Sequence, residues 1–180
     1  MSGNVPGDDS PRGLYFLTDL INTVQDDSPA GAADLQAVVE RHGGPPLALT
    51  ETTAGELRDA AASLVGILEL SDEDRAADAI NDLLDRYPAR PRLVRLPGRP
   101  WSLHSRAPHG TEPARWLLST AALALALWFS ERGYCAWGRC AAPGCRNYFI
   151  DTGRRSPQRY CSPRCGTRVR VAAHRAQRDQ

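Results

Sequence analysis

The sequence contains no lysine, so arginine supplies every basic side chain apart from the histidines. Its longest apolar run, Trp116 to Phe129, is interrupted by Ser119 and Thr120 and is shorter than the roughly 20 residues of a membrane-spanning helix. The first residues, MSGNVPGDDSPR, lack the basic start and apolar stretch of a signal peptide. These absences exclude a transmembrane helix, and we expect a cytoplasmic protein.

The composition is that of a soluble globular protein. The chain has 180 residues, of which 42% are apolar and 24% charged, and it contains no internal repeat. A chain of this length can bury a hydrophobic core without covalent cross-links. We therefore expect one or two small domains.

Cysteine and charge are unevenly distributed. None of the five cysteines lies in the first 134 residues, and all of them fall between Cys135 and Cys165. Residues 1–131 contain 11 arginines against 19 aspartates and glutamates, whereas residues 132–180 contain 11 arginines against two aspartates. This asymmetry predicts an acidic body joined to a basic, cysteine-bearing tail with a different role.

Apolar residues recur at helical spacing through the acidic body, and the last of these segments is apolar almost all round, as in a central helix packed on several sides. Two short strands around a Pro-Gly turn predict a β-hairpin before that last segment. The expected helices cover about 13–24, 32–41, 53–68, 72–87 and 112–130, and the expected strands cover 92–96 and 101–104.

The fold class expected from these elements is α+β and mainly helical, a helical bundle with one β-hairpin followed by a small cysteine-bearing domain. Residues 1–12 would be a disordered arm. Residues 13–132 would form the helical domain, which could sense a ligand or dimerise, and residues 135–178 would form the small cysteine-bearing domain.

Asn22 lies within an apolar helical segment, where an unpaired amide would cost roughly 1–3 kcal/mol. It therefore needs a partner, either a backbone carbonyl or a ligand in a pocket between helices. Trp101 and Trp116 could line such a pocket, although a core position is the more ordinary role of a tryptophan.

The cysteines form two close pairs, Cys140-Ala-Ala-Pro-Gly-Cys145 and Cys161-Ser-Pro-Arg-Cys165, separated by fifteen residues. Such pairs are typical of a closed four-thiolate zinc site, in which the protein occupies every tetrahedral position and the metal is structural. We expect one Zn²⁺ bound by these four residues. Cys135, the fifth cysteine, is either a buried or free thiol or a substitute ligand.

The surrounding sequence predicts that residues 135–178 form a treble-clef-like zinc finger with the order knuckle, hairpin and helix. Residues 147–151 and 158–160 are strand candidates, Ser162 can cap a helix, and Pro163 suits its first position. Arginines on this hairpin and helix form a basic surface suited to phosphate, and arginine can also contact guanine edges. The predicted DNA-contacting residues are Arg154, Arg155, Arg159, Arg164, Arg168, Arg170 and Arg175.

A protein that binds DNA would associate with the nucleoid, but other functions are compatible with the same residues. The basic helix could dock an acidic protein partner, or the finger could bind RNA by stacking bases on Tyr148, Phe149 or Tyr160. Catalysis is the weakest alternative, because the histidines form no catalytic pair. We therefore expect that the protein is not an enzyme.

The run from Cys140 to Arg170, with Arg159-Tyr160-Cys161 and Cys165-Gly166-Thr167-Arg168, resembles the CGNR zinc finger. Leu17-Thr18-Asp19-Leu20-Ile21-Asn22-Thr23 resembles the opening motif of the ABATE domain that precedes this finger in its family. The resemblance implies a stress-related bacterial transcription regulator with a DNA-binding finger and a sensing helical domain. It carries the zinc ligands over to the four paired cysteines, whereas Thr167 replaces the asparagine of the signature and Arg170 replaces its usual lysine.

Overall fold

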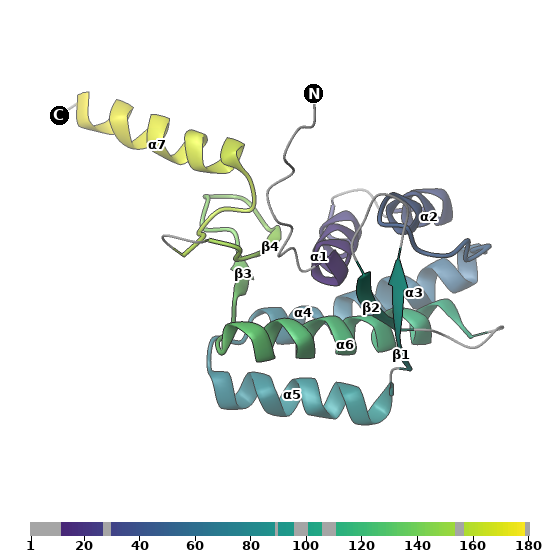
Figure 1. Cartoon of the computed structure of the whole chain (residues 1–180). Coiled ribbons are helices and arrows are strands. Elements are labelled where there is room, and N and C mark those ends of the chain that lie inside the picture. The colour runs from purple at the N-terminus through teal and green to yellow at the C-terminus, as the bar shows by residue number, and fades with distance from the viewer. Residues whose placement is uncertain are drawn as a thin grey trace, which may run out of the picture.

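The computed structural model describes residues 12–26, 30–88, 90–95, 101–105, 111–153 and 157–178. Helices dominate these ranges, and two antiparallel strand pairs complete the regular structure (Figure 1). The mainly helical α+β class is confirmed. No helix in the described ranges is long and apolar enough to span a membrane. The expected arm lies outside the described residues, except for Arg12.

Helix boundaries in the body follow local capping. Thr50 accepts a hydrogen bond from the Thr53 amide at the start of α3, and Asp72 accepts one from the Arg75 amide at the start of α5. The expected helix over 53–68 is divided at Leu64 into α3 and a short α4. In the described ranges, the helices before the hairpin are α1 (Arg12–Val24), α2 (Ala32–Arg41), α3 (Glu51–Ser63), α4 (Val65–Leu68) and α5 (Glu73–Arg86).

Helix α6 (Pro113–Arg132) is the central helix that its apolar sequence predicts. It contacts α1, α3 and α5 and also the second strand of the hairpin (Figure 1). Pro113 suits its first turn, and Gly133 ends it in the left-handed conformation at φ 70°. Its buried side chains are Trp116, Leu117, Leu118, Ala121, Ala122, Leu125 and Trp128.

The predicted hairpin is confirmed as β1 (Pro91–Arg95) paired with β2 (Trp101–Ser105). Leu93 lies opposite Leu103 in this register, and both side chains are exposed. The hydroxyls of Ser105 and Ser119 lie 2.8 Å apart, which links β2 to α6.

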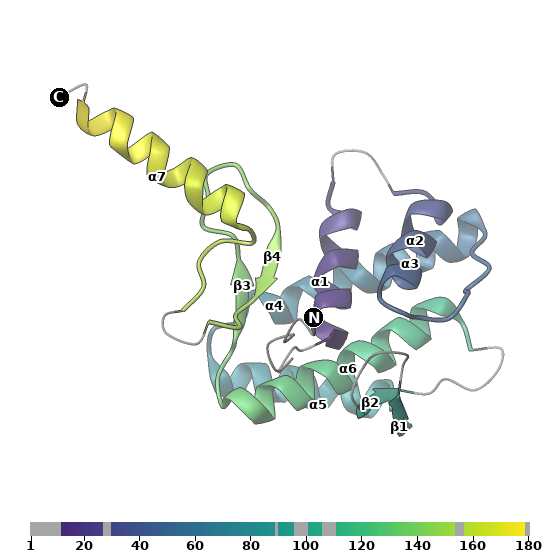
Figure 2. The same ribbon diagram turned by 45° about the horizontal axis from the view of Figure 1, so that its top comes forward.

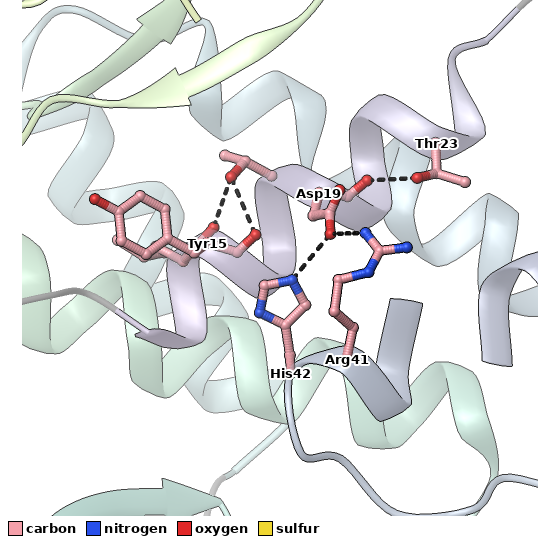
Figure 3. A network of polar contacts seen from close by, with 7 residues as sticks. Tyr15, Asp19, Thr23, Arg41 and His42 are labelled. Carbon is pink, nitrogen blue, oxygen red and sulfur yellow. Dashed lines mark hydrogen bonds and ion pairs between the residues drawn. The ribbon is translucent and has the colours of Figure 1, made fainter. Parts of the chain in front are cut away.

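A polar network fixes the end of α2 against α1 (Figure 3). One carboxylate oxygen of Asp19 accepts from Arg41 at 2.6 Å and lies 2.9 Å from the His42 Nε2. The His42 ring also packs against Phe16. His42 therefore helps to hold the end of α2 against α1.

The finger consists of β3 (Trp137–Arg139), β4 (Tyr148–Ile150) and α7 (Pro163–Arg178). Trp137, Tyr148 and Ile150 belong to the same hydrophobic core as the helical body. Helix α7 instead projects away from the body, with the C-terminus at its outer end (Figures 1 and 2). The finger thus has one part inside the core and one part in solvent.

Replacing Leu117 with alanine should lower the free energy of unfolding by about 2–5 kcal/mol, because this side chain is fully buried and its removal leaves a cavity in the core beside α6. Urea unfolding followed by circular dichroism measures the change. Leu127→Ala in the same helix is the matched control, since Leu127 is 43% exposed and should cost less than about 1 kcal/mol. Equal losses in the two variants would contradict the central position of α6.

Candidate metal centre and basic helix

The first cysteine pair lies in a tight turn between β3 and β4. The two strands are antiparallel, with Arg139 opposite Tyr148. The Cys140 amide donates to the Asn147 carbonyl at 2.8 Å, and the Cys145 amide donates to Ala142 at 3.0 Å. Gly144 adopts φ 71°, a conformation that glycine accepts without strain. This turn brings both thiols to one end of the strand pair.

The second pair lies at the start of α7. The Ser162 hydroxyl accepts from the Cys165 amide at 3.3 Å, as its predicted capping role requires, and Pro163 is the first helical residue. Gly166 is buried, and a Cβ at this position would lie 3.2 Å from the Tyr160 ring. The absence of a side chain therefore lets the Tyr160 ring pack against Gly166 in the first turn of α7.

Backbone contacts bring the two pairs together. The Ala141 amide donates to the Arg159 carbonyl at 2.9 Å. The Cys161 amide points at the Cys140 sulfur, 3.3 Å away. An N–H directed at a thiolate stabilises its negative charge, so this contact both aligns the segments and favours a metal ligand.

The four sulfur atoms have the spacing of a tetrahedral zinc site. The Cys145–Cys161, Cys161–Cys165 and Cys145–Cys165 Sγ distances are 3.7, 3.8 and 3.9 Å. All four sulfurs lie within 4.8 Å of one another. Zinc–sulfur bonds of about 2.3 Å in a tetrahedron require sulfurs about 3.8 Å apart. The predicted ligands Cys140, Cys145, Cys161 and Cys165 thus fit one zinc ion, held in a closed, structural site.

The thiols differ in acidity. Burial, reinforced by the neighbouring thiols, raises the pKa of Cys161 to about 12, and burial also raises the pKa of Cys145. Burial acts in the same direction on Cys140, but hydrogen bonds from the Cys161 and Ala142 amides, together with those from the neighbouring thiols, outweigh it and lower the pKa of Cys140. Zinc must displace protons from such thiols, so its affinity falls as the pH is lowered.

The strand pairing differs from the expectation in one respect. The candidate over 147–151 contains β4, but residues 158–160 form no strand, and the partner of β4 is Trp137–Arg139 before the first cysteine pair. The apolar pair Ala136-Trp137 is the feature of the sequence that indicates this strand. Both residues are buried in the core. The knuckle is therefore the loop of the hairpin.

Cys135 lies apart from this cluster. Its sulfur is 3.8 Å from the backbone carbonyl of Asp72. Burial, followed by the charges of Glu73 and Asp72, raises the pKa of Cys135. These surroundings favour a neutral thiol in contact with α5, the first of the two roles considered for Cys135.

The predicted DNA-contacting arginines fall into groups. Arg168 donates to the Pro143 carbonyl at 3.2 Å and lies 4.0 Å from the Cys165 sulfur, so it links α7 to the knuckle. Arg170 donates to the Thr167 hydroxyl at 3.1 Å. Thr167, which replaces the asparagine of the signature, therefore has a hydrogen-bond partner on the same helix. Arg159, Arg164 and Arg175 have exposed side chains, whereas Arg154 and Arg155 lie outside the described residues.

The three residues considered for a ligand pocket lie in different surroundings. The Asn22 amide donates to the Tyr148 carbonyl at 3.0 Å and accepts from the Tyr148 amide at 2.8 Å, so its partner is backbone. Trp116 is buried against Phe16, and Trp101 is 63% exposed on β2. The structure therefore does not bring Asn22 and these two rings together around one space.

The aromatic residues considered for RNA stacking are mostly inside the protein. Tyr148 and Phe149 are 3% and 8% exposed. The Tyr148 hydroxyl donates to Glu69 at 2.7 Å, and burial followed by this contact raises the pKa of Tyr148 to about 12. Rings held in this way are not accessible to a stacked base, which corrects the expectation for these two residues. The hydrogen bond to Glu69, which lies 79 positions away along the chain, could not be predicted from the sequence.

A helical bundle followed by a four-cysteine site and an exposed basic helix defines a two-part zinc-finger protein. Comparison with family models matches residues 137–178 to the CGNR zinc finger. Residues 16–131 match the ABATE model, described as "Putative stress-induced transcription regulator". The ABATE match covers more than half of the chain, so the protein belongs to the ABATE family, with the CGNR finger at its C-terminal side. No curated protein gives a significant match.

Purified protein should contain about one zinc ion per chain, and Cys161→Ser should lose it on gel filtration, because three thiolates leave one tetrahedral position without its ligand. Elemental analysis of the eluted protein measures the ratio. Cys135→Ser is the matched control and should retain the full ratio, since Cys135 lies outside the cluster. Zinc loss from Cys135→Ser would instead make Cys135 a ligand.

Proposed function

We propose that this protein is a transcription regulator that binds duplex DNA through α7. Residues 135–178 act as the DNA-binding finger, and residues 13–132 act as a helical domain that senses an effector or dimerises. The observation that carries the proposal is an arginine-rich helix without a carboxylate, fixed at one end by a metal site and surrounded by solvent over the rest of its length.

The charge of α7 suits phosphate. The helix contains five arginines and no acidic residue, and its side chains beyond Arg170 are all exposed. Arg164, Arg168 and Arg175 are spaced by four and seven residues, which places them on one face of the helix. Protein–DNA contacts go largely to phosphate oxygens, and arginine is well suited to them.

The shape of α7 suits the major groove. Sixteen helical residues extend for about 24 Å, and the major groove of B-DNA, about 12 Å wide, admits an α-helix. No other element of the described chain covers the outer turns of α7 (Figures 1 and 2). A helix with this little packing gains stability when a partner contacts it.

One finger with about five phosphate contacts binds weakly and depends steeply on salt, with a log–log slope of about −4 to −5. A dimer that places two copies of α7 on two half-sites would supply both affinity and specificity. This part of the proposal fails if the protein is monomeric both free and on its preferred DNA.

The second candidate function is docking of an acidic protein partner on α7. The same basic surface favours it, and the two functions differ in what the protein captures. RNA binding by base stacking is less favoured, because Tyr148 and Phe149 are buried.

Selection from sheared genomic duplex separates these functions. Zinc-loaded protein is mixed with the fragments at about 0.15 M salt, and bound fragments are sequenced beside a Cys161→Ser/Cys165→Ser sample. A shared motif that disappears in the double variant supports a zinc-dependent regulator. Uniform recovery would reduce the function to nonspecific phosphate binding, and no recovery would favour the protein partner.

Replacing Arg164 and Arg175 together with glutamine should weaken duplex binding and reduce the magnitude of the salt slope by about 2, because each lost phosphate contact removes about 0.9 from it. Fluorescence anisotropy between about 0.05 and 0.2 M salt measures the slope. Arg86→Gln is the matched control, an exposed arginine beside Asp82 on α5. If Arg86→Gln changes the salt slope as much as the double variant does, the proposal that α7 binds duplex DNA is contradicted.

A further inference from the structure

Tyr148 connects the zinc finger to the helical domain through both its backbone and its side chain. Its amide and carbonyl are paired with the side chain of Asn22 in α1. Its hydroxyl donates to Glu69, the residue that ends α4. Two helical elements, 126 and 79 positions away, therefore hold one residue of β4.

The Asn22 contact satisfies the free edge of a strand. In the antiparallel pair, Tyr148 lies opposite Arg139, yet both of its backbone groups are bonded to Asn22 and not to β3. An amide side chain supplies one donor and one acceptor at the spacing of a peptide group, so it can pair with a strand edge as a neighbouring strand would. Because Tyr148 is 3% exposed, water cannot easily replace these bonds.

This residue lies next to the metal site along the chain. The Cys140 amide is bonded to the carbonyl of Asn147, immediately before Tyr148, and this bond closes the loop that carries Cys140 and Cys145. Cys140 directly follows β3, the partner of β4. A displacement of β4 would therefore move both thiols of the first pair relative to the second pair, Cys161 before α7 and Cys165 in its first turn.

Further contacts place the hairpin against α6. The Trp128 indole donates to the Ala136 carbonyl at 3.2 Å, and Arg132 donates to the Asp151 carbonyl at 3.0 Å. These bonds hold the outer ends of the strand pair, whereas Asn22 and Glu69 hold the end beside the knuckle. Helix α7 has no comparable support, so the hairpin half of the zinc site is the half that the helical domain can position.

We propose that the helical domain preorganises the zinc site through Tyr148, with Asn22 and Glu69 as positioning residues for the Cys140–Cys145 loop. Zinc affinity then depends on Asn22 of α1 and on Glu69, which caps α4, although neither is a zinc ligand. By thermodynamic reciprocity, bound zinc stabilises the helical domain by the same factor. A change in α1 or α4 is in this way transmitted to the finger. The inference concerns the metal site and stands whether or not α7 binds DNA.

The test measures zinc affinity of the full chain by competition with a chromogenic chelator under reducing conditions at pH 7.5. Asn22→Ala should bind zinc about 10-fold more weakly, because it leaves two buried backbone groups of Tyr148 without partners. Asn22→Asp keeps an acceptor for the Tyr148 amide but places a carboxylate oxygen against the Tyr148 carbonyl, so it should lose at least as much. Tyr148→Phe removes only the bond to Glu69 and should lose about threefold.

Thr50→Ala is the matched control. It removes the N-cap of α3, which destabilises the helical domain at the end far from the finger (Figure 1). Its zinc affinity should stay within about twofold of the unaltered protein. Hydrogen exchange at the Tyr148 amide is the second readout and should accelerate in Asn22→Ala but not in Thr50→Ala.

Two results would overturn the proposal. One is an Asn22→Ala protein whose zinc affinity matches that of the unaltered chain. The other is an equal loss in Thr50→Ala, which would reduce the effect to general destabilisation. Where Asn22→Ala does not fold, Tyr148→Phe decides, and unchanged zinc affinity in that variant contradicts the inference. Neither readout uses DNA, so a failed DNA selection does not affect the result.

Discussion

Four sulfur atoms from two segments must lie about 3.8 Å apart around one zinc ion, and the rest of the finger depends on this constraint. The strand pair contributes three residues from each strand, too few to fix a fold alone. Helix α7 buries only Gly166. The metal site therefore sets the direction in which α7 leaves the protein, and with it the position of every arginine on that helix.

The helical domain and the finger share more structure than their separate family matches suggest. Trp137, Tyr148 and Ile150 lie in the core of the helical bundle, so half of the finger is built into the body. The other half, α7, extends into solvent. This division suits a regulator, because a rigid base can orient a helix that remains accessible to a partner. The acidic body and basic helix also stay apart, which leaves the arginines without competing carboxylates along α7.

Local signals predicted much of this structure. Helix periodicity identified α2 and the central α6, and cysteine spacing identified the metal ligands, because both depend on residues close in sequence. Contacts between residues far apart in the sequence were harder to predict. Residues 158–160 were a plausible strand, but β4 pairs with Trp137–Arg139, and short apolar runs do not reveal their partners. Asn22 required a partner, and the sequence left open which one, since Tyr148 lies 126 positions away.

Hydrogen exchange on the full zinc-loaded chain, with and without its selected duplex, tests most directly whether α7 is the DNA-binding surface. The account predicts that duplex slows exchange across Pro163–Arg178 and leaves α5, whose exposed face is acidic, unchanged. Protection of β1 and β2, with no change in α7, would contradict it and move the nucleic-acid surface to the other hairpin.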